Sequence, residues 1–123
     1  MDAFLFQDFI TAKGNFGGGN PQVIQSASDW IDLGNYEDLV LYTDVRVVTG
    51  GATMTFETAA VRQDSAFVTL VPSFTMGTGT RVDQVQASLA KVPPLRYLRW
   101  NILFGAVPSD VTFRVWLGAY SHV

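Results

Sequence analysis

Hydrophobic and polar residues alternate along several short stretches of this chain, and a period of two residues is the pattern of a half-buried β-strand. The clearest stretch runs from Leu39 to Val48. Glycine or proline interrupts the alternation about every ten residues, as in folds built from many short strands. Eight strands are predicted on this basis, over residues 4–10, 22–26, 39–48, 52–60, 66–71, 80–88, 95–104 and 111–120. The sequence therefore predicts an all-β fold, a single jelly-roll-like antiparallel β-sandwich of about eight strands with an N-terminal arm.

The dipeptide Gly50–Gly51, which follows the clearest strand, suits the positive φ angles of a two-residue hairpin turn. Such a turn would pair Val47 with Met54 and Val45 with Phe56. Both pairs place apolar side chains opposite each other, which supports this register. The sequence thus predicts that the two strands flanking Gly50–Gly51 are neighbours in one sheet.

The same register would place two carboxylates, Asp44 and Glu57, directly opposite each other, which is unfavourable. One interpretation is a divalent cation held by these hard oxygen ligands. The other is a solvated pair of side chains whose charge is offset by Arg46 on the same face. Two carboxylates are too few for a calcium site, so the sequence favours the second interpretation.

The N-terminal part of the chain differs in composition from the rest. Residues 1–21 are expected to form an arm and a glycine-rich loop, and residues 22–123 the β-sandwich domain. Within the arm, residues 4–10 fit either a first strand or an extended segment. The loop ends without the Gly-Lys-Ser/Thr sequence of a phosphate-binding loop, which argues against a nucleotide site.

The last two strands carry the most informative alternation, and they are expected to form a terminal hairpin. One face holds only apolar residues and is assigned to the core: Leu98, Trp100, Ile102, Phe104, Val111, Phe113, Val115 and Leu117. The opposite face holds Tyr97, Arg99, Asn101 and Leu103 from one strand and Arg114, Trp116 and Tyr120 from the other. Tyr, Trp and Arg are enriched at the energetic centres of protein interfaces. This face is therefore predicted to contact another protein or a covering segment, with a ligand platform as the less favoured alternative.

The N-terminal arm is a candidate for covering that face, in the same chain or in a neighbouring one. Phe4 and Phe6 point to one side of an extended arm and Phe9 to the other, so the arm is apolar on both sides. Phe4 and Phe6 are accordingly included among the expected interface residues.

Composition narrows the possible functions. Charged residues make up 15% of the 123 residues and the net charge is −3. This excludes intrinsic disorder, and it argues against a partner that is nucleic acid. With no cysteine and a single histidine, His122, the chain offers no Cys-ligated zinc and no well-placed catalytic base. Asp29 and Asp32 flank Trp30, and Glu37 and Asp38 follow closely, but no pattern places two of these carboxylates across a cleft. Asp29 and Asp38 are read as turn residues rather than as members of an acid–base pair. No enzymatic activity, metal or cofactor is expected, although a hydrolase with a carboxylate pair remains a weaker alternative.

Two segments resemble a known family. Trp30-Ile31-Asp32-Leu33-Gly34 resembles the opening of galactose-binding-like (discoidin-type) jelly rolls, and Leu95-Arg96-Tyr97-Leu98-Arg99-Trp100 resembles a strand near the end of the same fold. The resemblance covers about residues 30–120, and it implies the jelly-roll architecture rather than sugar binding. The chain departs from the secreted members of that family because it has no cysteine pair and no recognisable secretory signal.

The whole chain also resembles small structural proteins of tailed bacteriophages, which often have a short arm, glycine-rich loops and few charges. This resemblance implies a virion protein made in the host cytoplasm, either a head decoration or a minor capsid subunit. Its partners would be copies of itself, as a trimer or a larger ring, and other virion proteins. Neither nucleic acid nor a membrane is expected as a partner, since no run of residues is long and apolar enough to span one. The alternative function is a carbohydrate-binding module of galactose-binding-like fold.

Overall fold

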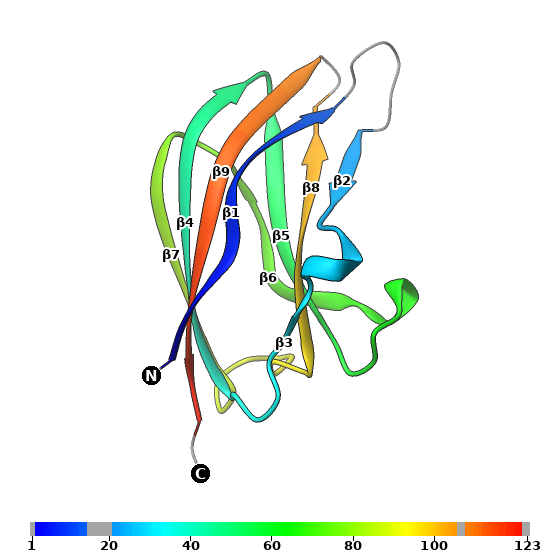
Figure 1. Ribbon diagram of the computed structural model, residues 1–123, viewed down its shortest axis with the longest axis vertical. Coiled ribbons are helices and arrows are strands. Elements are labelled where there is room, and N and C mark those ends of the chain that lie inside the picture. Colours follow the sequence, from blue (N-terminus) through cyan, green and yellow to red (C-terminus); the bar gives the residue numbers. More distant parts are fainter. Residues whose placement is uncertain (1, 15–20, 106–107, 122–123) are drawn as a thin grey trace.

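The computed structural model describes residues 2–14, 21–105 and 108–121, which form two antiparallel β-sheets packed face to face (Figure 1). The strands in chain order are β1 (Asp2–Gly14), β2 (Gln22–Ile24), β3 (Ile31–Asp32), β4 (Asp38–Thr49), β5 (Ala52–Ala59), β6 (Val68–Thr75), β7 (Gly79–Gln86), β8 (Tyr97–Phe104) and β9 (Ser109–Tyr120). Two short 3₁₀ helices, η2 (Ala27–Asp29) and η3 (Asp64–Ala66), lie in connections. The predicted all-β sandwich is confirmed.

The two sheets have interleaved connectivity. Sheet A has the strand order β1-β9-β4-β7, and sheet B has the order β2-β8-β5-β6, with β3 also paired to β8. The chain crosses from one sheet to the other at most connections, and among the longer strands only β5 and β6 are neighbours both in sequence and in space. These crossings give the sandwich a jelly-roll topology.

The N-terminal segment belongs to sheet A. β1 is hydrogen-bonded to β9 from the pair Asp2–Ala119 to the pair Gly14–Ser109, with two register shifts between Leu5 and Ile10. Residues 4–10 are thus an edge strand, one of the two forms expected from the sequence. Residues 15–20 of the predicted glycine-rich loop and His122 lie outside the described residues.

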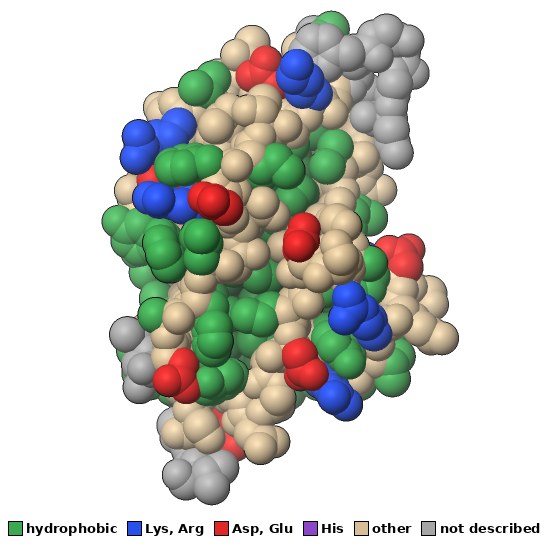
Figure 2. Space-filling view, in the orientation of Figure 1, with side chains coloured by type: hydrophobic (Ala, Val, Ile, Leu, Met, Phe, Trp, Pro, Cys, Tyr) green, Lys and Arg blue, Asp and Glu red, His purple; other side chains and the backbone are tan. Residues whose placement is uncertain are grey.

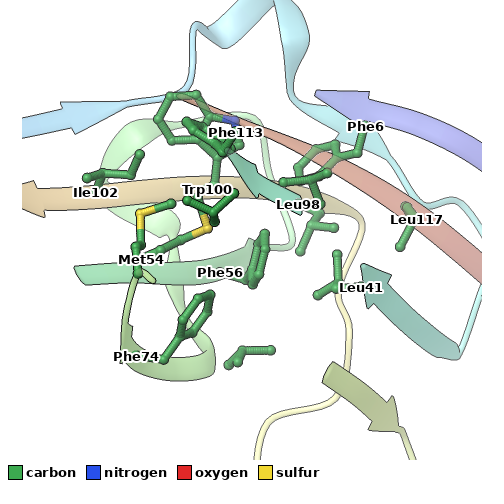
Figure 3. Packing of buried hydrophobic residues seen from close by; sticks show 14 of the residues in the cluster. Phe6, Leu41, Met54, Phe56, Phe74, Leu98, Trp100, Ile102, Phe113 and Leu117 are labelled. Atoms are coloured by element: carbon green, nitrogen blue, oxygen red, sulfur yellow. The ribbon is translucent and has the colours of Figure 1, made fainter. Parts of the chain in front are cut away.

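The core lies between the sheets and is built by the inward side chains of both. All eight residues assigned to the core of the last two strands are buried. The indole of Trp100 in sheet B meets the ring of Phe113 in sheet A edge to face, with the centroids 5.1 Å apart (Figure 3). Trp100 Nε1 donates to Gln7 Oε1 at 3.1 Å, so the one polar atom of this large side chain is satisfied within the core.

The predicted hairpin at Gly50–Gly51 is wrong. β4 pairs with β7 and β9 in sheet A, whereas β5 pairs with β6 and β8 in sheet B. Gly50, with φ +78°, lies where the chain crosses between the sheets, and a Cβ there would meet Ser109 Oγ at 2.3 Å. The alternating pattern gave the wrong pairing because Val45 and Phe56 are buried equally well as neighbours in one sheet or as residues that face each other across the core.

The predicted opposition of Asp44 and Glu57 fails with that register. Asp44 lies in register with Arg114 and Thr80 in sheet A, and Glu57 lies in register with Arg99 in sheet B. The two carboxylates are on the outer surfaces of different sheets, so they form neither a cation site nor a repelling pair. Each is instead within reach of an arginine.

Candidate interaction surface

An apolar stripe crosses the outer face of sheet A at right angles to its strands. The stripe consists of four residues in register, one from each strand of the sheet: Leu5, Trp116, Tyr42 and Val82. Their exposed fractions lie between 39% and 58%. Figure 2 shows hydrophobic side chains gathered over this part of the molecule, with basic side chains beside them toward the upper end. A row of large apolar side chains in register is more contiguous than the scattered apolar residues of an ordinary surface.

A group of charged and aromatic side chains borders the stripe on the side toward Thr49. Arg46 Nε and Arg114 Nη2 each lie 3.3 Å from the carboxylate of Asp44. Both guanidinium groups also lie over the ring of Phe9, with Cζ–centroid distances of 5.1 and 4.4 Å. Two cations thus share one carboxylate and one aromatic ring, a cluster able to contact apolar and anionic groups alike.

Small and uncharged residues border the stripe on its other side. The row next to the stripe holds Ala3, Gly118, Val40 and Gln84, each in register with the next across the sheet. The row beyond it pairs Tyr120 with Asp38. The surface of sheet A is therefore raised by bulky arginines on one side of the stripe and lower over the row of Ala3 and Gly118 on the other side, with Tyr120, 39% exposed, in the row beyond.

The part of the outer face of sheet B around Arg99 is covered by the chain itself, whereas Leu103 on the same face is 53% exposed. Arg99 is only 4% exposed, and its Nε and Nη1 atoms lie 2.8 and 2.6 Å from carboxylate oxygens of Glu57 and Asp64. Its guanidinium lies 3.9 Å from the ring centre of Phe67 and 5.2 Å from the ring of Trp30. The two rings meet each other edge to face at 4.7 Å. The segments around η2 and η3 thus close over this part of the sheet.

The predicted interface residues of the last two strands do not share a surface. Tyr97 and Arg99 lie in β8 of sheet B, whereas Arg114, Trp116 and Tyr120 lie in β9 of sheet A. The expected terminal hairpin is therefore wrong, for the same reason as at Gly50–Gly51. Only the three residues of β9 remain together on one outer face. Arg99 is occupied within its own chain.

The two phenylalanines expected in a covering arm point inward. Phe6 is 5% exposed and packs on Phe56 with the ring centres 6.5 Å apart. Phe4 is half-buried and meets Tyr36 edge to face. Tyr36 Oη donates to the carboxylate of Asp2, and this hydrogen bond raises the pKa of Tyr36 above its ordinary value. These contacts hold β1 in the sandwich.

Sequence reasoning missed three of the four stripe residues: Leu5, Tyr42 and Val82. Alternation does place Tyr42 on the opposite side of its strand from Leu39 and Leu41. The signal that was lacking is the strand order, because only the pairing of β4 with both β9 and β7 joins these positions into one row.

A groove of about 820 Å³ opens between the edge strands β6 and β7. Arg81 and Asp83 of β7 point inward along it and pair at 2.9 Å, and Pro72 removes one backbone donor from β6. Inward charges and proline on edge strands are devices that prevent the addition of another strand. The described residues that line the groove include no aromatic ring, which a sugar platform would use.

The remaining chemistry of the described residues is sparse. They contain no group of three potential metal ligands, and none of their helices could span a membrane. On the loop side of β3, Asp32 accepts hydrogen bonds from Arg96 and from the Gly34 N–H, which lower the pKa of that carboxyl.

The fold and surface define a jelly-roll β-sandwich in which the outer face of sheet A is open and the outer face of sheet B is partly covered by the chain's own segments. Comparisons with protein-family models, with curated proteins and with solved structures gave no match for this chain.

Proposed function

We propose that the chain is a structural subunit of a bacteriophage particle, a head decoration or minor capsid protein that stabilises the assembly through protein–protein contacts. The observation that carries this proposal is the apolar stripe on the outer face of sheet A, with the arginine cluster beside it. Contact with a neighbouring subunit would remove these side chains from water, and separating the subunits would expose them again.

The composition of the surface supports this role. The residues enriched at interface centres, Trp, Tyr and Arg, meet here at Trp116, Tyr42 and Arg114. Jelly rolls are frequent in viral capsid proteins, and they also occur in lectins. The low charge of the chain, 15% of its residues, fits a surface partly reserved for neighbours.

The direct test is to purify particles released from cells that carry the native gene, on a density gradient, and to analyse them by mass spectrometry. The chain is expected in the particle fraction at a fixed ratio to the main shell protein. Its absence from particles, while it is abundant in the same cells, would overturn the proposal.

A pair of variants assigns the role to sheet A. The double variant Trp116→Ala/Tyr42→Ala is expected to lower incorporation about tenfold or more, because truncated interface anchors each cost at least tenfold in affinity. Leu103→Ala is the control, since Leu103 is 53% exposed on the outer face of sheet B. If both variants enter particles like the wild type, the stripe does not form the contact.

The carbohydrate-binding alternative predicts a different result for the isolated protein. Titration with a panel of sugars, followed by tryptophan fluorescence, should leave the emission unchanged if the chain is a particle subunit. A saturable change that follows one sugar class would replace the proposed function with that alternative.

A further inference from the structure

The outer face of sheet A is large enough for a specific interface. Eight consecutive residue pairs join β4 to β7, and the sheet has four strands. At ~3.3 Å per residue and ~4.8 Å between strands, the face covers roughly 500 Å² in projection. Two such faces would bury about 1,000 Å² or more in total once side-chain relief is included, the lower limit for a specific complex.

The relief of this face is complementary to itself. If a two-fold axis ran along the stripe, each stripe residue would face the same residue of the second copy. The row on one side of the stripe would face the row on the other side in the second copy. On β9, which has Trp116 on the axis, Arg114 would then face Gly118 of a second copy. The long side chain of Arg114 in each copy would thus lie over Gly118 of the other copy, which has no side chain.

The charges of β4 follow the same rule. With Tyr42 on the axis, Arg46 of one copy would lie near Asp38 of the second, because the two residues lie on opposite sides of Tyr42 along β4, with Arg46 at the register shift between Val45 and Val47. The guanidinium side chain of Arg46 is 61% exposed, and its own partner Asp44 is shared with Arg114. Asp38 lies at the opposite end of the same strand, where its Oδ1 accepts a hydrogen bond from the Ala87 N–H at 2.9 Å. The rotation thus brings Arg46 of each copy close to Asp38 of the other copy, so the contact occurs twice in a dimer.

From this self-complementarity we infer that a second copy of the chain covers the outer face of sheet A, with the two copies related by a two-fold axis along the apolar stripe. This inference rests on the proposed function, because it names the partner for the same surface. A self-complementary face closes as a pair, whereas a trimer or ring requires two different surfaces on each subunit. At this contact the inference therefore predicts a dimer, in contrast to the trimer or ring expected from the sequence.

Sedimentation of the purified chain over a range of concentrations tests the inference. The wild type should form a dimer, and Tyr42→Asp should weaken it by about a hundredfold, because the axis places two introduced carboxylates against each other. Leu103→Asp, on the outer face of sheet B, should dimerise like the wild type. A wild-type chain that stays monomeric or forms trimers, or a Tyr42→Asp dimer of undiminished affinity, would overturn the inference.

Cross-linking tests the direction of the axis. The chain has no cysteine, so Val82→Cys introduces a single thiol on the stripe, where its copy is expected opposite. A short bis-maleimide should convert this variant to a covalent dimer. Leu103→Cys, of similar exposure, should stay monomeric under the same conditions. Equal cross-linking of both variants would overturn the proposed axis.

The charge pairing has its own matched control. Arg46→Glu should weaken the dimer about tenfold, because it places two carboxylates together at each end of the interface. Arg96→Glu should leave the affinity unchanged, since the side chain of Arg96 is also 61% exposed but lies by β3. Equal effects of the two variants would contradict the predicted orientation.

The two proposals fail separately. A chain that stays monomeric in solution but is present in purified particles overturns the dimer and leaves the structural role intact. A dimer that behaves as predicted but is absent from particles overturns the structural role and leaves the self-association intact.

Discussion

Each outer face of the sandwich carries an arginine among aromatic rings, and the two arginines differ in burial and in hydrogen bonding. Arg99 of sheet B is buried, with carboxylates on two of its nitrogens and two rings over its guanidinium. Arg114 of sheet A has a side chain 28% exposed, and its buried Nε lacks a hydrogen-bond partner among the described residues. One arginine is satisfied within the chain, and the other is incompletely paired.

The difference shows that a pattern of arginine and aromatic residues does not by itself mark an interface. On sheet B the same pattern is used to fasten the chain's own connections, since Asp64 and Phe67 come from the segment around η3. On sheet A no described segment lies over the stripe, whose residues stay at least 39% exposed. The stripe on sheet A is a contiguous uncovered surface that can accept another chain.

The largest test of this contrast is Arg99→Met. The substitution keeps an apolar stem under the rings but leaves Glu57, whose side chain is 15% exposed, without its cation. Breaking a mostly buried ion pair in this way should lower the free energy of unfolding by about 3 kcal/mol. Urea denaturation followed by circular dichroism measures the change.

Arg114→Met is the matched substitution on the open face. Its partner Asp44 retains Arg46, so the isolated chain should lose less than about 1 kcal/mol. The measurement is made on the Tyr42→Asp background, so that self-association does not contribute. Equal losses at Arg99 and Arg114 would remove the distinction between the two faces.

The cover of sheet B should depend on Trp30. Its ring packs on Phe67, and its Nε1 donates to the carbonyl oxygen of Gln25 at 2.9 Å. Trp30→Ala removes both contacts from a partly buried site, and the free energy of unfolding should fall by about 2 kcal/mol, below the cost of deleting a fully buried tryptophan. Hydrogen exchange should rise in residues 60–67 and stay unchanged in β9. Uniform exchange along the chain would show that Trp30 does not hold this cover.

Much of the fold could be predicted from alternation, because a strand that buries one side has hydrophobic residues at every second position. The inward residues of β8 and β9, for example Trp100 and Phe113, are where the pattern places them. Alternation does not indicate which strands are neighbours in a sheet. In a sandwich, strands joined by a short connection can lie in one sheet or face each other, and both arrangements bury Val45 and Phe56.

The same limit explains how the candidate site was only partly predicted. Trp116 and Tyr120 were expected at the surface and are each 39% exposed. Arg99 was expected beside them, but it lies across the sandwich under η3, because neither the crossing to the other sheet nor the covering loop leaves a local signal. Long-range pairing decides both features.

Trp116→Ala should change stability mainly through association. Because Trp116 is on the outer face and 39% exposed, the isolated chain should lose less than about 1 kcal/mol. The thermal midpoint of the wild type should rise with protein concentration, since a dimer is favoured by mass action, and this dependence should disappear in the variant. Calorimetry at two concentrations a hundredfold apart measures it, and an unchanged slope would contradict the role of Trp116.

The smallest predicted effect concerns the exposed ion pair beside β3, which contrasts with the buried pair of Arg99 on the same side of the molecule. Arg96 Nη2 lies 3.2 Å from Asp32, and this contact together with the Gly34 N–H lowers the pKa of Asp32 from its ordinary value of 3.8. A carboxyl with a lowered pKa in the folded state stabilises the fold above its ordinary pKa, and the contribution is lost as the pH falls through the lower folded value.

Solvent screens this exposed pair, so Asp32→Asn should cost less than about 0.5 kcal/mol at pH 7. The difference from the wild type should shrink below pH 4 as the carboxyl of the wild type becomes protonated. Arg96→Gln should produce a similar small loss, and the double variant should add little to either single one, because both substitutions remove the same interaction. Urea denaturation of the four proteins at pH 7 and pH 3 checks this cycle. A loss at Asp32 as large as that at Arg99 would mean that the loop beside β3 is part of the cover of sheet B, rather than a solvated margin of it.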